Sequence, residues 1–161
     1  FTDGSFVYDG TEKTLAITGT LPTGTSVSYT IDGAAGNGAT DVGTYDLVAA
    51  ITGGTNYNDL VLNAELEITK ATITGITFTD GSFVYDGTEK TLAIAGTLPA
   101  GASVSYTIDG NAGNGATDVG TYNLVATIEG GANYNDLVLN AELEITKANI
   151  TGVTFTDGSF V

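Results

Sequence analysis

The sequence predicts an all-β protein in which antiparallel β-sandwich units repeat in tandem with a period of 77 residues. Residues 1–15, FTDGSFVYDGTEKTL, recur letter for letter at residues 78–92, and the same stretch begins again at residues 155–161. Short segments of alternating apolar and polar residues are separated by Gly-, Asn- and Asp-rich turns, at the spacing of about 8–12 residues typical of sandwiches. No window shows the helical period of about 3.6 residues. A fixed period of this kind indicates a repeat architecture.

The repeat sets the domain organisation that we expect. Residues 1–70 form an immunoglobulin-like repeat that lacks its first strand, residues 71–147 form a complete repeat, and residues 148–161 supply the first strand or strands of a third. The chain starts and stops within a repeat, so we expect it to be a segment of a longer polypeptide. About seven short strands per unit predict the immunoglobulin type of sandwich. Because the chain has no Cys and no Trp, its core must be aliphatic and tyrosine-based.

The first half of the repeat predicts three short strands. Residues 6–8 are β-rich and are flanked by turn-forming Asp and Gly. Residues 13–19 alternate until the Pro-x-Gly turn at residues 22–24. The next alternating segment, residues 26–31, places three apolar side chains inward: Val27, Tyr29 and Ile31.

The longest loop is expected at residues 32–41, and its counterpart in the second copy at residues 109–118. It contains Asn37-Gly38, a strong signal for a tight turn. We therefore expect the chain to reverse there before the second half of the repeat begins.

The second half predicts two longer strands. After Val42-Gly43-Thr44, the first of these directs four side chains to one face, and residues 60–69 then hold a period of 2 over ten residues. Glu65 and Glu67 fall on the outward face of the last strand, where like charge protects an edge. The inward side chains of the two strands are Tyr45, Leu47, Ala49 and Ile51, followed by Leu60, Leu62, Ala64, Leu66 and Ile68.

No Pro- or Ser-rich linker separates the copies. Residues 71–78 run on with only Gly75 as a bend or bulge, so the last strand of one unit passes almost directly into the first strand of the next. This continuity predicts a stiff junction between repeats.

Composition excludes several classes of function. The chain carries 19 acidic residues against 4 lysines, has no Arg and no His, and has a net charge of −15, which repels nucleic acid and anionic lipid. No apolar run approaches the ~20 residues needed to span a bilayer, so this segment predicts no membrane contact. Without His or Cys, a serine nucleophile lacks its usual activator, and we expect no enzymatic activity and no required cofactor.

Carboxylates are the remaining catalytic candidates. Asp3, Asp9 and Asp32 offer the residue type that glycoside hydrolysis needs in pairs. All three lie in turns, however, where Asp is favoured for its backbone chemistry, and we take that role as theirs. The sequence therefore predicts no catalytic residues.

Calcium is the better ligand hypothesis. The oxygen-rich loops at residues 32–41 and 109–118 supply carboxylates and carbonyls, the ligands that hard cations take, but without the spacing of an EF-hand. A solvated acidic loop is the alternative. The candidate calcium ligands are Asp32, Asp41, Asp109 and Asp118.

Two further features have a functional and a structural interpretation. An intramolecular isopeptide bond from a lysine to Asn or Asp could replace disulfides, whereas simple exposure of the lysines is the plainer interpretation. Tyr57 and Tyr134, between glycines and asparagines, could stack on sugars, or cap one end of a sandwich. The candidate lysines are Lys13, Lys70, Lys90 and Lys147.

The two copies differ at ten of the 77 aligned positions. Nine of the ten fall in expected loops or on outward faces, and only Ile76/Val153 touches an expected core position. A stacked structural unit behaves in this way, since its packing is kept while its surface changes. Two loop differences, Ala34/Asn111 and Thr55/Ala132, argue against a shared ligand-binding loop.

Several motifs together resemble a known family. They are YDGT-x-K-x-L at residues 8–15, GTLP-x-G-x-x-V-x-Y at residues 19–29, VGTY at residues 42–45, NY at residues 56–57 and L-x-ITKA at residues 66–71, and all recur in the second copy. This pattern resembles the MBG ("mostly bacterial Ig") domains, tandem repeats of large secreted or surface-anchored bacterial proteins, many of them adhesins. The resemblance implies an extracellular β-sandwich module at the cell surface and brings no catalytic residues.

These observations predict a structural repeat of a bacterial surface stalk, fibre or filament that projects or spaces other domains. The alternative is an adhesin module that binds a glycan or host surface through its end loops. Expected partners are neighbouring repeats of the same chain, or another subunit that adds a strand.

Overall fold

The computed structural model describes residues 1–158, and every regular element in that range is a β-strand. The all-β prediction is therefore confirmed, with seven strands in each of two repeats. The last three residues of the expected third repeat lie outside the described residues. The first repeat contains β1 (Gly4–Val7), β2 (Lys13–Thr14), β3 (Ser26–Ile31), β4 (Ala34–Ala35), β5 (Gly38–Ala39), β6 (Gly43–Thr52) and β7 (Leu60–Thr69). The second contains β8 (Gly81–Val84), β9 (Lys90–Thr91), β10 (Ser103–Ile108), β11 (Asn111–Ala112), β12 (Gly115–Ala116), β13 (Gly120–Glu129) and β14 (Leu137–Thr146).

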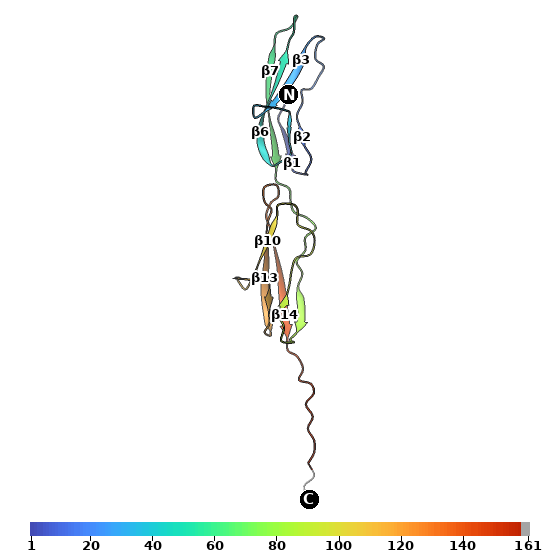
Figure 1. Cartoon of the computed structure of the whole chain (residues 1–161), viewed down its shortest axis with the longest axis vertical. Coiled ribbons are helices and arrows are strands. Elements are labelled where there is room, and N and C mark those ends of the chain that lie inside the picture. Colours follow the sequence, from blue (N-terminus) through green and yellow to red (C-terminus); the bar gives the residue numbers. More distant parts are fainter. Residues whose placement is uncertain (159–161) are drawn as a thin grey trace. The chain divides into compact units, whose positions relative to one another are not determined.

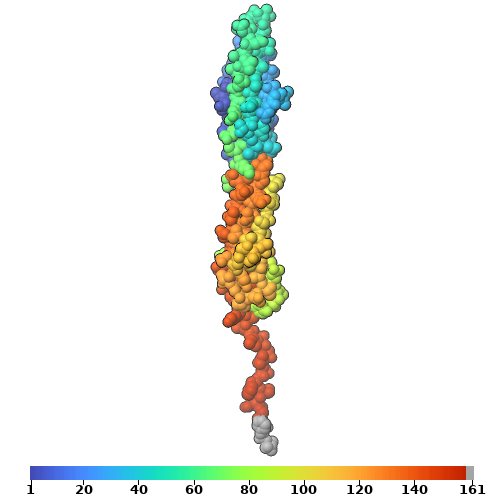
Figure 2. Space-filling view, turned by 90° about the vertical axis from the view of Figure 1, so that its left-hand side faces the viewer, coloured from blue at the N-terminus to red at the C-terminus, as the bar shows by residue number. Residues whose placement is uncertain are grey.

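Each repeat is built from one five-stranded and one two-stranded sheet. In the first repeat the larger sheet has the order β1-β7-β6-β3-β4, and β2 pairs with β5; the second repeat follows the same order. In the first repeat every pair is antiparallel except β1 with β7, and in the second repeat β8 likewise pairs in parallel with β14. The long neighbours β6 and β7 lie side by side in the ribbon drawing (Figure 1). In the space-filling view the green residues of β7 lie beside the cyan residues of β6 (Figure 2).

The described residues divide into two compact units whose limits cross the repeat boundaries. The first unit is formed by Phe1–Thr74 together with two loops from the second repeat, Pro99–Ser103 and Glu129–Asp136. The second unit is formed by Gly75–Leu98, Val104–Ile128 and the chain from Leu137 onward. The first repeat is therefore completed by chain that lies far away in the sequence.

The strands predicted from alternation are found where the alternation is longest. β3 and β7 have the predicted bounds, whereas β6 already includes Gly43 and Thr44, which were expected to lead into it. Along β7 the side chains of Ala64, Leu66 and Ile68 are buried while their neighbours face outward. Leu60, the first residue of β7, is the exception, since it is 50% exposed.

The core of the first repeat is small and aliphatic, as predicted. Leu47, Leu66 and Ile68 are fully buried, and half-buried apolar side chains pack against them. Leu124, Leu143 and Ile145 form the same cluster in the second repeat. The half-buried neighbours in the first repeat are Phe1, Tyr8, Leu15, Ile31, Ala39, Val42 and Tyr45.

The segment at residues 13–19 differs from the prediction. Only Lys13–Thr14 pairs as a strand, although burial continues to alternate as far as Ile17. The backbone beyond Thr14 finds other partners: Leu15 N–H donates to Asn37 O at 3.0 Å, and Ile17 N–H donates to the Tyr29 hydroxyl at 3.1 Å. Side-chain and loop acceptors thus replace the ladder that alternation predicted.

The longest loop also differs from the prediction. It contains the short strands β4 and β5, and the tight turn is formed by Asp32-Gly33, which joins paired Ile31 and Ala34. Both turn residues have positive φ, 47° and 80°, as a two-residue hairpin turn requires. Asn37 instead donates its side-chain amide to Leu15 O at 2.8 Å. The predicted Asn-Gly turn was therefore wrong.

The junction between the repeats is not a continuous strand. Ala71 and Thr77 each form one isolated bridge, to Tyr134 and Ala95 respectively, and Gly75 between them has φ +75°. The expected bend at Gly75 is present. The stiffness of the junction stays a prediction.

Candidate functional site

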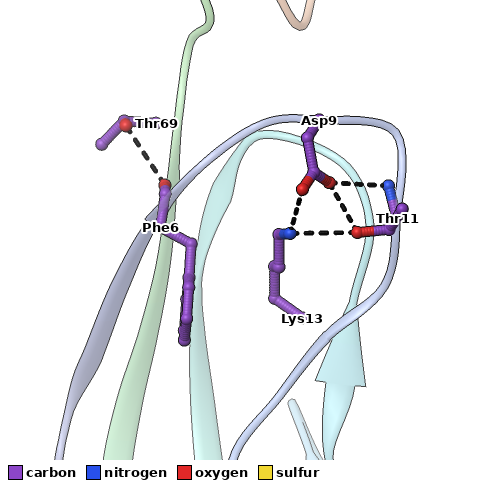
Figure 3. A network of polar contacts seen from close by, with 5 residues as sticks. All are labelled: Phe6, Asp9, Thr11, Lys13 and Thr69. Carbon is purple, nitrogen blue, oxygen red and sulfur yellow. Dashed lines mark hydrogen bonds and ion pairs between the residues drawn. The ribbon is translucent and has the colours of Figure 1, made fainter.

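A polar network follows the first strand. The Asp9 carboxylate accepts hydrogen bonds from Lys13 Nζ at 2.5 Å, from Thr11 Oγ1 at 2.6 Å and from Thr11 N–H at 2.9 Å. Figure 3 shows these three side chains directed toward one another, beside the bond from Thr69 Oγ1 to Phe6 O. The second repeat builds the same network from Asp86, Thr88 and Lys90.

The network lowers the pKa of Asp9. The hydrogen bond from Lys13, followed by those from Thr11, holds the pKa of Asp9 well below its usual range, and Lys90 acts in the same way on Asp86. An isopeptide bond would require the lysine amine to attack a carboxyl carbon and release water. An ionised carboxylate paired with an ammonium group is a poor electrophile for that step, and a link between residues four apart would constrain little chain. The crosslink stays a prediction.

Lys13 and Lys90 are less exposed than the plainer interpretation assumed, whereas Lys70 and Lys147 are exposed as it expected. The Lys13 side chain is only 16% exposed, because it lies over the Asp9 turn. Lys70 donates from Nζ to the Gly131 carbonyl at 2.8 Å. Both lysines therefore act as hydrogen-bond donors that fix loops.

A loop from the second repeat is held against one end of the first. We call Gly130–Asp136 the clasp loop; it belongs to the first compact unit. Its Asn133 accepts a hydrogen bond at Oδ1 from Val42 N–H at 2.9 Å and donates from Nδ2 to Asp41 Oδ1 at 3.0 Å. The backbone adds two bonds, Ala71 N–H to Asn133 O at 3.0 Å and Asn135 N–H to Ala71 O at 2.8 Å. Both the oxygen and the nitrogen of the Asn133 side-chain amide therefore have hydrogen-bond partners.

An aromatic contact lies beside these bonds. The rings of Tyr8 and Tyr134 meet edge to face with centroids 5.4 Å apart, a preferred geometry for aromatic pairs. This contact gives Tyr134 the capping role, the second of the two interpretations of that residue. Its counterpart Tyr57 is 53% exposed.

The clasp loop is held in shape by its own chain. Gly130 N–H donates to the Asp136 carboxylate at 2.8 Å, which closes the loop on itself. A Cβ on Gly130 would lie 2.3 Å from the Tyr134 carbonyl oxygen, so only glycine fits there. The loop at Gly53–Asp59 is closed in the same way, by Gly53 N–H and Asp59 at 2.8 Å.

Three of the four predicted calcium ligands have a protein partner at the carboxylate, and the fourth, Asp118, has one at its backbone carbonyl. The carboxylate of Asp32 accepts a hydrogen bond from Asp46 N–H at 2.9 Å, as Asp109 does from Asn123 N–H. Asp41 binds Asn133, and the carbonyl of Asp118 accepts the Tyr122 hydroxyl at 3.0 Å. Within residues 1–158, no group of three or more acidic side chains is arranged to hold a metal. Calcium binding at these loops stays a prediction.

The three turn carboxylates considered for catalysis bind separate partners. Asp3 accepts a hydrogen bond from Glu65 N–H at 2.9 Å, Asp9 binds Lys13, and Asp32 binds Asp46 N–H. Asp9 fixes its own turn, which is the role that turn chemistry predicts, whereas Asp3 and Asp32 each accept from a backbone amide of a long strand elsewhere in the repeat.

A shallow depression on the outer face of β6 and β7 is acidic. It has a volume of about 510 Å³ and is bordered by Asp3, Asp46 and Glu65. Asp46 and Glu65 are directly opposed across the two strands. The same depression in the second repeat contains Asn123 in place of Asp46 and measures about 320 Å³. Because the two depressions differ in charge, they argue against a ligand site shared by both repeats.

The roles of Asn133, Val42 and Ala71 were not predicted from the sequence. The only signal was the Asn-Tyr pair recurring at residues 56–57 and 133–134, which the period made visible without giving its partner.

Comparison with known proteins gives one family and several structures. The model of the MBG domain family matches residues 1–72 and 74–149. The chain is similar to the fibronectin(III)-like modules of Clostridium thermocellum CbhA, at 10% identity over 97% of this chain and 96% of that chain, with a TM-score of 0.32. It is also similar to Bacteroides ovatus SGBP-B, at 14% identity over 90% of this chain and 43% of that one, with a TM-score of 0.36. An I-band fragment of titin matches at 13% identity over 91% of this chain and 63% of that chain, with a TM-score of 0.33. A search among curated proteins finds no match.

Proposed function

The chain belongs to the MBG domain family in two tandem copies, and from that premise we propose that it is a structural repeat of an extracellular bacterial surface stalk or fibre. In this role each unit adds length and spaces other domains away from the cell. A spacer needs only to be stable and soluble, and it requires no substrate.

One observation carries the proposal. The same seven-strand unit is built twice, and the differences between the copies avoid the fully buried side chains. A spacer must keep the packing of each unit, whereas its surface residues can change. Its length and its contacts with neighbouring repeats matter more than any one loop.

The surface charge supports the same function. A net charge of −15 spread over small repeats favours a soluble exterior that does not adhere to nucleic acid or to anionic membranes. No helix among the residues that the structure describes is long and apolar enough to cross a membrane.

An adhesin module that binds a glycan or host surface is the second candidate. It is favoured by Tyr57, which is 53% exposed at the tip of a preformed loop, the type of side chain on which a sugar ring stacks. A glycan array separates the two candidates. A spacer leaves the array blank, and a signal that Tyr57→Ala abolishes would establish the adhesin.

The spacer function is tested by inserting arrays of this repeat between a surface anchor and a fluorescent reporter domain. The height of the reporter above the cell surface should rise by the same increment for each added repeat. A height that stays constant as repeats are added would contradict the proposal.

A further inference from the structure

The second repeat carries an uncovered copy of the surface that holds the clasp loop in the first unit. In that unit, Val42 and Tyr8 are half-buried and pack against the core cluster. Their counterparts one period later, Val119 and Tyr85, are 43% and 40% exposed. The sequence around both pairs is the same, so the difference in exposure comes from what lies against them.

This surface is already shaped to receive a loop. The Asp118 carbonyl accepts the Tyr122 hydroxyl at 3.0 Å, as the Asp41 carbonyl accepts the Tyr45 hydroxyl at 2.9 Å. The Asp86 network repeats the Asp9 network bond for bond. We call Tyr85, Asp118, Val119, Lys147 and Ala148 the receiving surface, since their counterparts hold the clasp loop in the first unit.

The first repeat carries the complementary element. Gly53–Asp59 has the sequence GGTNYND, against GGANYND in the clasp loop, and the same Gly-to-Asp bond closes it. Tyr57 is 53% exposed, whereas Tyr134 is half-buried. A loop held in its bound shape loses little freedom when it docks.

Apolar side chains beyond the receiving surface are also uncovered. Ile150 and Val153 are 90% and 80% exposed, while their counterparts Ile73 and Ile76 are 5% and 8% exposed. Burial of such side chains stabilises by about 25 cal/mol per Å² of apolar surface removed from water. The residues that follow the second repeat thus expose apolar side chains whose counterparts one period earlier are buried.

We propose that the receiving surface of the second repeat binds the Asn-Tyr loop of another copy of this repeat. Asn56 of the incoming copy accepts at Oδ1 from Val119 N–H and donates from Nδ2 to Asp118, its Tyr57 packs edge-on against Tyr85, and Lys147 donates to its Gly54 carbonyl. The contact is head-to-tail, so it does not close and each added copy presents a new receiving surface. This inference rests on the proposed spacer function and identifies the contact that joins one repeat of the array to the next.

The joint is tested between two separate chains. An isotope-labelled Asn56→Ala chain, which keeps its receiving surface, is titrated with unlabelled Asp118→Ala chain, which keeps its Asn-Tyr loop, at about 0.15 M salt to limit charge repulsion. Amide NMR signals of Val119 and Tyr85 should shift with concentration, while those of Val42 and Tyr8 stay in place.

The control partner is the double variant Asn56→Ala, Asp118→Ala. It should remove the shifts, because the amide that binds both Val119 and Asp118 is gone. Equal shifts with the control partner, or none with the first partner up to millimolar concentration, would overturn the proposal. If the joint fails while reporter height still rises with each repeat, the spacer function stands with a different joint.

Discussion

The side-chain amide of Asn133 donates to the carboxylate of Asp41 at 3.0 Å, across 92 positions of the sequence. The same side chain accepts from Val42 N–H at 2.9 Å. One asparagine thus satisfies a carboxylate and a backbone donor at the end of the first repeat, and the equivalent Asn56 lies in a loop with its tyrosine exposed.

Replacing Asn133 by Ala should destabilise the first unit by about 1–3 kcal/mol, since two hydrogen bonds are lost at a partly buried position. The sharpest measurement is hydrogen exchange at the Val42 amide, which should accelerate. Asn56→Ala is the matched control and should leave that amide unchanged. Unaltered exchange at Val42 in Asn133→Ala would show that the clasp is not formed.

Asp46→Asn should stabilise the first repeat by about 0.2–1 kcal/mol, because Asp46 directly opposes Glu65 and like charges across strands destabilise. The second repeat already has Asn123 opposite Glu142, so Asn123→Asp should cost a similar amount. Urea unfolding at low salt measures both changes. A destabilised Asp46→Asn variant would refute the charge argument.

Lys13→Met should raise the pKa of Asp9 toward its ordinary value, because the hydrogen bond from Lys13 is the largest cause of the lowering. A carboxyl whose pKa is lowered on folding stabilises above its unfolded pKa of about 3.9, and this contribution is lost as pH falls through the folded pKa. The stability gap between wild type and variant should therefore be full near neutral pH and shrink in acid. Carbon NMR titration of Asp9 measures the shift, and Lys90→Met, which acts on Asp86, should leave Asp9 unchanged.

Gly130→Ala should open the clasp loop, because its Cβ would lie 2.3 Å from the Tyr134 carbonyl oxygen. Overpacking of this kind costs about 1–3 kcal/mol. Val42 should lose exchange protection, as in Asn133→Ala. Gly53→Ala distorts the equivalent loop, with a contact of 2.0 Å, and should leave Val42 protected. Equal effects of the two variants on Val42 would contradict the assignment of the loop.

The long strands could be predicted from sequence because their pattern is local. β7 is found at Leu60–Thr69 as predicted, since ten residues of strict alternation leave one register that buries Leu66 and Ile68. The short strands β4 and β5 were missed because two residues carry no period. Their existence depends on partners such as Lys13–Thr14, which pair with β5 from elsewhere in the chain.

The contacts of the candidate site could not be predicted. Asn37-Gly38 and Asp32-Gly33 carry the same kind of turn signal, and the choice between them depends on Asn37 binding Leu15 O. The partner of Asn133 lies one repeat away, and nothing in the local sequence specifies it. Non-local hydrogen bonds are properties of the assembled chain.

Whole repeats that join stiffly should add a fixed length each. Small-angle scattering on arrays of two, three and four repeats, with and without calcium, measures this growth. We expect a maximum dimension that increases by a constant increment per repeat in both conditions. A dimension that grows with the square root of repeat number would contradict it, and linear growth only with calcium would make the acidic loops part of the joint.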